Sequence, residues 1–293
     1  MKRTIIILTA VLYAFTVNAL PAPTMDNLMF RNITTSDGLS SNKIHSILHD
    51  SHGFLWVASA DGLDRYDAYD FHSFTEEELG RARTVISALY EDPEGNIIVR
   101  AYSGDILFDY STGEFVHGLQ GYLKALGLPQ DYRSIGAEAR KYVWVSTESE
   151  IWIHDSTIGK CISIPKHSAQ LSGLCIRHDS VYHIYDDSRV FMSGLQDGKT
   201  REILTNEGIR KSLSGNGPKT FVDSEGHLWL YSTLSPHLFR MTQFPDRWEY
   251  IQLTGEHGQF NRISAIGEGA DGNIWITTTH SAGFIYDKAD GTL

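Results

Sequence analysis

A short alternating run, a tight turn and a dense apolar run recur along the chain. Residues 44–48 alternate between apolar and polar side chains, which predicts a strand. The Asp-x-x-Gly at residues 50–53 predicts a turn that the aspartate side chain caps and in which the glycine takes a positive φ. The apolar run around Trp56 then predicts a strand buried on both faces.

Two more strands complete each unit. Residues 62–67 and 283–287 follow small-residue turns and indicate third strands, and the more polar residues 70–74 indicate a fourth. Four strands in about 44 residues, with one buried aromatic per copy, are typical of a propeller blade. Aligned on that aromatic position, the copies have their anchors at Trp56, Ile98, Trp144, Tyr182, Trp229 and Trp275, in steps of 42, 46, 38, 47 and 46 residues.

The sequence therefore predicts an all-β fold, a β-propeller of four-stranded blades with six visible repeats. A β-sandwich would not need the same turn at a fixed period, and a β-helix would repeat over a much shorter period. The third copy keeps its tryptophan and loses the turn glycine, and the fourth copy is the weakest.

The N-terminus has the layout of an export signal. Lys2 and Arg3 precede an apolar run at residues 5–17, and residues 17–19 fit a cleavage site. We expect a signal peptide at 1–19, an N-terminal segment with a closing strand at 20–41, and propeller repeats at 42–293, the last blade being truncated. An uncleaved anchor is the alternative to cleavage.

Composition narrows the function classes. The chain has 293 residues, 41% of them hydrophobic, so it can bury a substantial core. Its net charge of −11 argues against a nucleic-acid partner, which would need a basic surface.

The repeat register places Cys161 on an outer strand and Cys175 on the inner strand of the next unit, too far apart for a disulfide. We expect both thiols to be free and buried.

The first unit resembles the repeat of the two-component regulator propeller family. Its residues 30–34 and 37–40 are similar to the start of such a domain. Residues 50–67, which read DSHGFLWVASADGLDRYD, match the repeat almost position for position. The resemblance spans residues 28–293 and is strongest in the first, second and last units.

This resemblance implies a periplasmic sensor module of a hybrid two-component receptor of the kind common in Bacteroidota. It implies an oligosaccharide ligand derived from a polysaccharide, no enzyme activity in this chain and no cofactor. The partners that it implies are a further propeller, a linker and a histidine kinase domain of the same receptor, and a homodimer stays open. The alternatives are a glycan-active propeller enzyme of the sialidase or lyase type and a protein-binding propeller scaffold.

The sixth unit lacks an outer strand, which has two explanations. The chain can be an N-terminal fragment of a longer receptor whose ring has seven blades, which we favour. Alternatively, residues 29–34 supply the missing strand and close a ring of six. Closure matters because an open sheet edge can pair with another chain.

Several motifs that suggest chemistry are explained by the repeat. Gly267, Gly269 and Gly272 fit a dinucleotide fingerprint, but a strand follows them where that motif needs a helix. Histidines 45, 49 and 52 have a helical metal-ligand spacing, but they fall on a strand and a turn. We therefore predict no catalytic residue and no metal site.

Loops at one face of the propeller are the expected ligand site. Polar and aromatic side chains there suit a sugar through ring stacking and bidentate hydrogen bonds. The candidates are Asn42, Asp61, Arg83, Tyr102, Arg133, Glu148, Asn261, Arg262 and His280. The repeat position of Trp56, Trp144, Trp229 and Trp275 instead predicts a role in the blade core.

Overall fold

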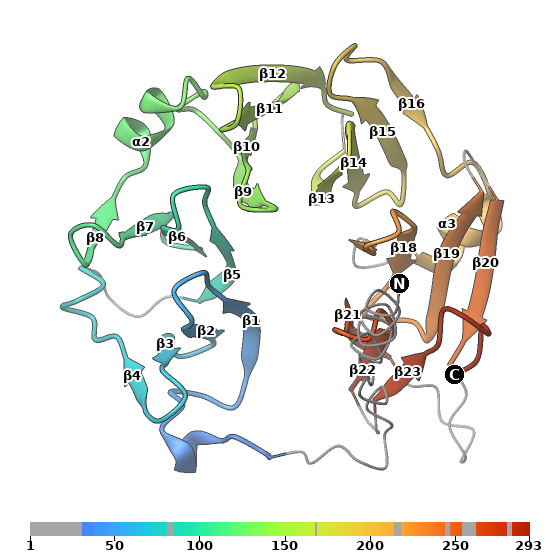
Figure 1. The fold of residues 1–293 in the computed structure, drawn as a ribbon. Coiled ribbons are helices and arrows are strands. Elements are labelled where there is room, and N and C mark those ends of the chain that lie inside the picture. The colour runs from blue at the N-terminus through green and yellow to red at the C-terminus, as the bar shows by residue number, and fades with distance from the viewer. Residues whose placement is uncertain are drawn as a thin grey trace, which may run out of the picture. The chain divides into compact units, whose positions relative to one another are not determined.

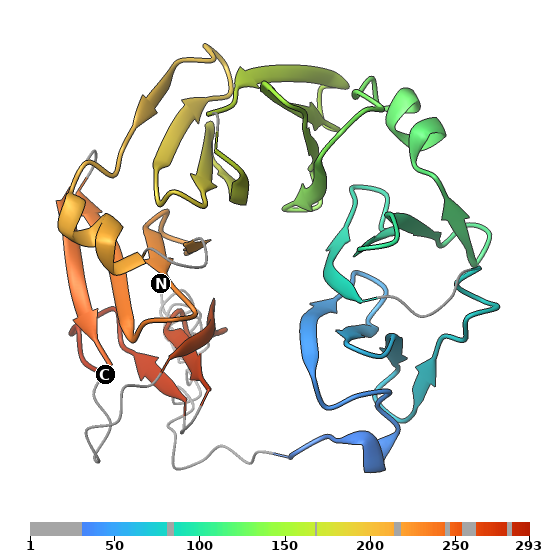
Figure 2. The same cartoon turned by 180° about the vertical axis from the view of Figure 1, so that it is seen from behind.

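Six antiparallel sheets are arranged in a ring, and each runs from an inner strand to an outer strand in chain order (Figure 1). Five sheets have four strands, and the sixth has three among the described residues. The same succession is visible from the opposite side (Figure 2). The protein is therefore a six-bladed β-propeller, as the repeat predicts.

This computed structural model describes residues 31–80, 85–167, 169–213, 218–243, 247–253, 262–279 and 283–293. The ring lies in the compact unit Ile33–Leu293. The predicted signal peptide at 1–19 lies outside the described residues. No helix in the described part of the chain is long and apolar enough to cross a membrane.

Each blade is a simple meander of consecutive strands. The first three are β1 (Ile44–His49), β2 (Leu55–Ser59), β3 (Leu63–Tyr66), β4 (Phe71–Ser73); β5 (Ile86–Glu91), β6 (Ile97–Ala101), β7 (Ile106–Asp109), β8 (Glu114–His117); and β9 (Ser134–Glu138), β10 (Tyr142–Ser146), β11 (Glu150–Asp155), β12 (Lys160–Pro165). The last three are β13 (Leu171–Arg177), β14 (Ser180–Tyr185), β15 (Val190–Gly194), β16 (Thr200–Glu202); β17 (Lys219–Val222), β18 (Leu228–Tyr231), β19 (His237–Gln243), β20 (Arg247–Gln252); and β21 (Ile263–Glu268), β22 (Ile274–Thr278), β23 (Phe284–Tyr286).

The turn between the first two strands has the geometry that its sequence predicts. Asp50 accepts hydrogen bonds from the backbone N–H groups of His52 at 3.0 Å and Phe54 at 2.9 Å. Gly53 takes a φ of 92°, which disfavours side chains with a Cβ. The other carboxylate oxygen accepts from the indole N–H of Trp56 at 2.6 Å. One carboxylate thus fixes the turn and the core aromatic together.

Apolar clusters join successive blades. Five such clusters link the first sheet to the second and so on to the sixth. Polar contacts add to them, because His45 lies in a β-bulge of β1 and its Nδ1 is 3.0 Å from the carbonyl oxygen of Ile86 in the next blade. Ser172, in the corresponding bulge of β13, donates to the carbonyl of Pro218 at 3.3 Å. Neighbouring inner strands are therefore fixed in register.

The third and fourth blades are complete although their sequence copies are degraded. The structure also contains a 3-10 helix, η2 (Thr35–Asp37), and two short helices, α2 (Gln120–Ala125) and α3 (Glu207–Leu213), that the sequence pattern did not predict. Residues 29 and 30 lie outside the described residues, and 31–34 form no strand, so closure by this segment stays a prediction.

The two cysteines lie on the strands that the register predicts. Cys161 is half-buried on the outer strand β12, and its thiol donates to the carbonyl of Leu126 at 3.0 Å. Cys175 is buried on the inner strand β13, where burial raises the pKa of its thiol. Only Cys175 is fully buried, because Cys161 lies at the outer edge of its sheet.

Candidate functional site

A small polar cavity lies against the inner strands of four consecutive blades, the second to the fifth. Its volume is about 150 Å³. The inner strands β5, β9, β13 and β17 supply most of the lining, and β6 and β10 supply the rest. The lining residues are Tyr90, Arg100, Ser134, Trp144, Leu171, Ser172, Gly173, Leu174, Lys219 and Thr220. In Figure 1 the inner strands β5, β9 and β13 face the middle of the ring. We call this hollow the channel pocket.

Arg100 brings a cation to the channel pocket from strand β6. The residue two positions after the anchor is Ala58 in the first blade, Ser146 in the third and Tyr231 in the fifth. An arginine therefore departs from the repeat, in which this position is otherwise uncharged. Its Nε is buried and has no hydrogen-bond partner. A buried donor of this kind is costly unless an acceptor reaches it.

Trp144 differs from its counterparts in the first and fifth blades. There, Asp50 and Asp223 stand six residues before the tryptophan and accept its indole N–H, Asp223 from Trp229 at 3.0 Å. In the third blade that position is Glu138, and the Nε1 of Trp144 is buried without a partner.

The ring of Trp144 instead lies over the inner strand β9. It packs there so closely that a Cβ added at Gly136 would come within 2.5 Å of the ring. This side chain is only 5% exposed, so the channel pocket has a second buried donor without an acceptor.

Hydroxyl groups and a lysine complete the polar lining. The hydroxyls of Ser134 and Ser146 are 2.6 Å apart, and the single proton of the Ser172 hydroxyl has the carbonyl of Ile184, at 3.2 Å, as an alternative acceptor to that of Pro218. Lys219 begins strand β17 and is exposed. Among the described residues, the pocket lining thus includes two cationic side chains, Arg100 and Lys219, and no carboxylate.

Acidic groups lie near the pocket but have their own partners. Asp105 accepts a hydrogen bond from Tyr132 at 3.0 Å, and Glu138 lies 3.5 Å from a guanidinium nitrogen of Arg177. Burial raises the pKa of Tyr90, and the neighbouring Arg100 acts against this shift. Tyr90 is therefore a neutral hydroxyl at physiological pH.

Glu138 gives this region a pH dependence. Burial raises the pKa of Glu138 from 4.5 to about 7, against the opposing charge of Arg177. The folded state then binds a proton that the unfolded state has released, so stability falls as pH rises from 4.5 to about 7 and levels off above it. Between about pH 5 and about pH 8, we expect the free energy of unfolding from urea curves to fall less in Glu138→Gln than in the wild type, because the contribution of Glu138 is lost. An equal change of the unfolding free energy with pH in both proteins would contradict the raised pKa of Glu138.

The predicted loop residues other than Arg133 and Glu148 fall into four groups. Tyr102, in the turn between β6 and β7, has 83% of its side chain exposed. Asn42 and Arg262 are exposed at the starts of inner strands, and the side-chain oxygen of Asn42 accepts from the backbone N–H of Thr35 at 2.9 Å. Asp61 lines a separate hollow of about 320 Å³ with residues 73–76. The remaining candidates Arg83, Asn261 and His280 lie outside the described residues.

The structure brings two of the predicted residues together. Arg133 and Glu148 form an exposed ion pair, with guanidinium nitrogens 3.0 and 3.2 Å from one carboxylate oxygen. Arg133 directly precedes Ser134, which begins strand β9 and lines the channel pocket. This ion pair therefore lies next to the pocket lining. Sequence reasoning missed the pocket itself, and the arginine at the anchor-plus-two position was the signal that could have found it.

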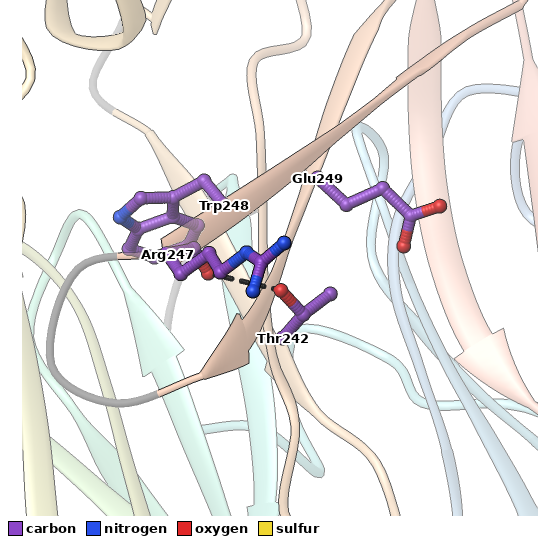
Figure 3. Close-up of a pocket in the computed structure, with 4 residues that line it drawn as sticks. All are labelled: Thr242, Arg247, Trp248 and Glu249. Carbon is purple, nitrogen blue, oxygen red and sulfur yellow. Dashed lines mark hydrogen bonds between the residues drawn. The ribbon is translucent and has the colours of Figure 1, made fainter.

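A larger hollow of about 510 Å³ lies at the outer edge of the fifth blade. Thr242, Arg247, Trp248 and Glu249 line it, and all four come from the β19–β20 hairpin (Figure 3). Thr242 donates to the carbonyl of Arg247 at 3.3 Å. Among the described residues one hairpin forms the lining, so this hollow brings together no described groups from different blades. The channel pocket is the better candidate despite its smaller volume.

Within the described ranges, no group of three or more His, Cys, Asp or Glu side chains is placed to hold a metal ion. The three histidines with metal-ligand spacing are dispersed. His45 contacts the next blade, and the ring of His52 stacks on Tyr110 at 3.8 Å between centroids.

Comparison with known proteins identifies the repeat. Residues 38–61 match the family model described as two component regulator propeller. A histidine kinase from Formosa agariphila is 35% identical over 69 residues, which cover 24% of this chain and 5% of that protein. The resemblance predicted from the sequence is therefore confirmed.

Solved structures share the fold. One is the extracellular domain of a protein described as a hybrid two component system from B. thetaiotaomicron, with a TM-score of 0.61 and 20% identity over 89% of this chain and 36% of that one. Another is virginiamycin B lyase from Staphylococcus aureus, with a TM-score of 0.58 and 13% identity over 83% and 84% of the two chains. This chain thus spans little more than a third of the length of that extracellular domain.

Proposed function

Since the chain carries a repeat of the two component regulator propeller family, we propose that it is the ligand-sensing module of a two-component receptor. In this proposal the propeller lies in the periplasm and binds an oligosaccharide. Further domains of the same receptor pass the binding event to a histidine kinase. The observation that carries the proposal is the family repeat at residues 38–61. The similarity to a histidine kinase from F. agariphila supports it.

We propose that the chain binds its ligand without chemical turnover. The aspartates of the repeated turns are candidates for a catalytic acid, but their carboxylates accept hydrogen bonds that stabilise the turns. Asp92 accepts from the backbone N–H groups of Glu94 at 2.9 Å and Asn96 at 2.8 Å, as Asp50 does in the first blade. A carboxylate held by turn amides is not placed to protonate a glycosidic oxygen. Assays of the purified propeller for hydrolase and lyase turnover test this point.

A saccharide titration tests the sensing site. Tyr102 is exposed on the face of the β6–β7 turn, where its ring can stack on a sugar. We expect Tyr102→Ala to weaken binding of a polysaccharide hydrolysate about 2- to 10-fold, the usual contribution of one stacking aromatic. Calorimetry with size-fractionated hydrolysates provides the measurement.

Tyr69→Ala is the matched control for this titration. Tyr69 is 87% exposed, and its turn between β3 and β4 lies at the opposite end of the strands. Equal affinity of the two variants would remove Tyr102 from the site.

Capture of a stable protein partner, with no saccharide binding, would favour the scaffold function. Reading the gene downstream of the Leu293 codon tests the receptor, because the proposal requires a membrane span and a kinase domain there.

A further inference from the structure

We propose that the channel pocket binds the anionic group of an acidic saccharide, a carboxylate or a sulfate. This inference rests on the proposed sensing function and specifies the ligand class. It uses Arg100, Lys219 and the indole N–H of Trp144, none of which the repeat needs for its fold.

The first argument is hydrogen bonding. The Nε of Arg100 and the Nε1 of Trp144 are buried donors without acceptors, and both residues line the same cavity. Buried polar groups almost always have a partner, so two orphaned donors in one hollow indicate an absent acceptor. An oxyanion supplies several lone pairs and can accept from both, and its bonds to a cationic donor are about twice as strong as neutral ones.

The second argument is charge. The whole chain has a net charge of −11, yet the described residues that line the pocket include two cationic side chains and no carboxylate. Asp105 and Glu138, the acids near Tyr90, are paired with Tyr132 and Arg177. A cationic site is thus built locally into an acidic chain. Solvent ions screen charges over about 8 Å at physiological salt, so the distant carboxylates of the chain would repel an anion in the pocket only weakly. The two cations in direct contact with the anion would therefore dominate.

The third argument is size. A volume of about 150 Å³ is roughly that of five water molecules in the liquid, and it lies below the usual range for a drug-sized ligand. The pocket therefore suits one charged substituent with part of its ring. Ser134 and Lys219 begin their inner strands, at the same end as the β6–β7 turn that holds Tyr102. The remainder of a saccharide could extend onto that face.

Calorimetry on the complete chain with glucuronate, glucose and inorganic sulfate tests the inference. We expect glucuronate to bind and glucose to bind at least 10-fold more weakly, as one charged hydrogen bond would give. Arg100→Gln should weaken glucuronate about 10- to 100-fold, and Trp144→Phe, which keeps a ring but removes the N–H, about 10-fold. Lys219→Gln should weaken it, whereas the matched control Lys199→Gln, at a side chain 86% exposed beside Asp197, should not.

The outcomes separate this inference from the sensing function. Binding of sulfate but no saccharide, lost in Arg100→Gln, would support the anion pocket and count against saccharide sensing. Equal binding of glucose and glucuronate would support saccharide sensing and overturn the anion pocket. Unchanged glucuronate affinity in both Arg100→Gln and Trp144→Phe, with native circular dichroism spectra, would overturn the pocket assignment. So would the absence of binding by both anions.

Discussion

Trp56→Ala is expected to lower the free energy of unfolding by about 3–5 kcal/mol, the usual cost of emptying a buried tryptophan site. The Trp56 side chain is fully buried between the first two blades. Its ring stacks on Phe74 at 5.4 Å and meets Phe108 at 5.1 Å between centroids. The substitution leaves a cavity at this interface and deprives Asp50 of a donor. A lower urea midpoint with an unchanged m-value is the measurement.

Two variants test this explanation. Trp56→Phe keeps an aromatic ring and loses the indole N–H, so we expect it to cost about 1–3 kcal/mol, near the value of one charged hydrogen bond. Trp248→Ala removes the same side chain from the outer strand β20, where it is half-buried. If Trp248→Ala were as costly as Trp56→Ala, burial at the repeat position would not be the cause.

The sequence was sufficient to predict the blades because most copies carry local signals for the same turn and buried strand, and the fixed period locates the degraded third and fourth copies. The spacing of the anchors also contained information that was not used. The step of 46 residues between Ile98 and Trp144 accommodates α2, and the step of 47 between Tyr182 and Trp229 accommodates α3. These helices have six and seven residues, and both are shorter than two turns. They are therefore too short to show the apolar period of a helix in the sequence.

The channel pocket could not be predicted in the same way because it depends on long-range geometry. Its lining comes from four blades, and their inner strands meet only once the ring has formed. In the third blade Glu138 stands at the position that accepts the indole N–H in the first and fifth blades, and the Nε1 of Trp144 has no partner. The loop predictions, by contrast, needed only the register, which identifies strand ends but not the partners of Arg133 or Asn42.

Lys288→Met should cost about 1.5–3 kcal/mol, the usual contribution of hydrogen bonds to charged groups. The Lys288 side chain, 7% exposed, follows β23 of the sixth blade. Its ammonium nitrogen lies 2.6 Å from Glu268, 3.0 Å from Glu225 and 3.9 Å from Asp223. Asp223 and Glu225 belong to the fifth blade, so the lysine links two blades. Its loss leaves the partly buried carboxylate of Glu268 without its cation.

The pH dependence of this cluster gives a second measurement. Burial acts to raise the pKa of Glu268, but hydrogen bonds from Lys288 and Ser224 outweigh it and hold the pKa below 4.5. A depressed folded pKa contributes stability above the unfolded pKa, and that contribution disappears as pH falls through the folded value. The difference between wild type and Lys288→Met should therefore shrink in acid.

Glu268→Gln distinguishes an unpaired charge from lost packing. In the Lys288→Met background it removes the stranded carboxylate, so the double variant should recover part of the lost stability. Lys199→Met, at the exposed ion pair with Asp197, is the control and should change stability by less than about 1 kcal/mol. If the double variant were less stable than Lys288→Met, and the deficit persisted in acid, the aliphatic stem of Lys288 would be the stabilising element. The carboxylates around it would then be solvated well enough to need no cation.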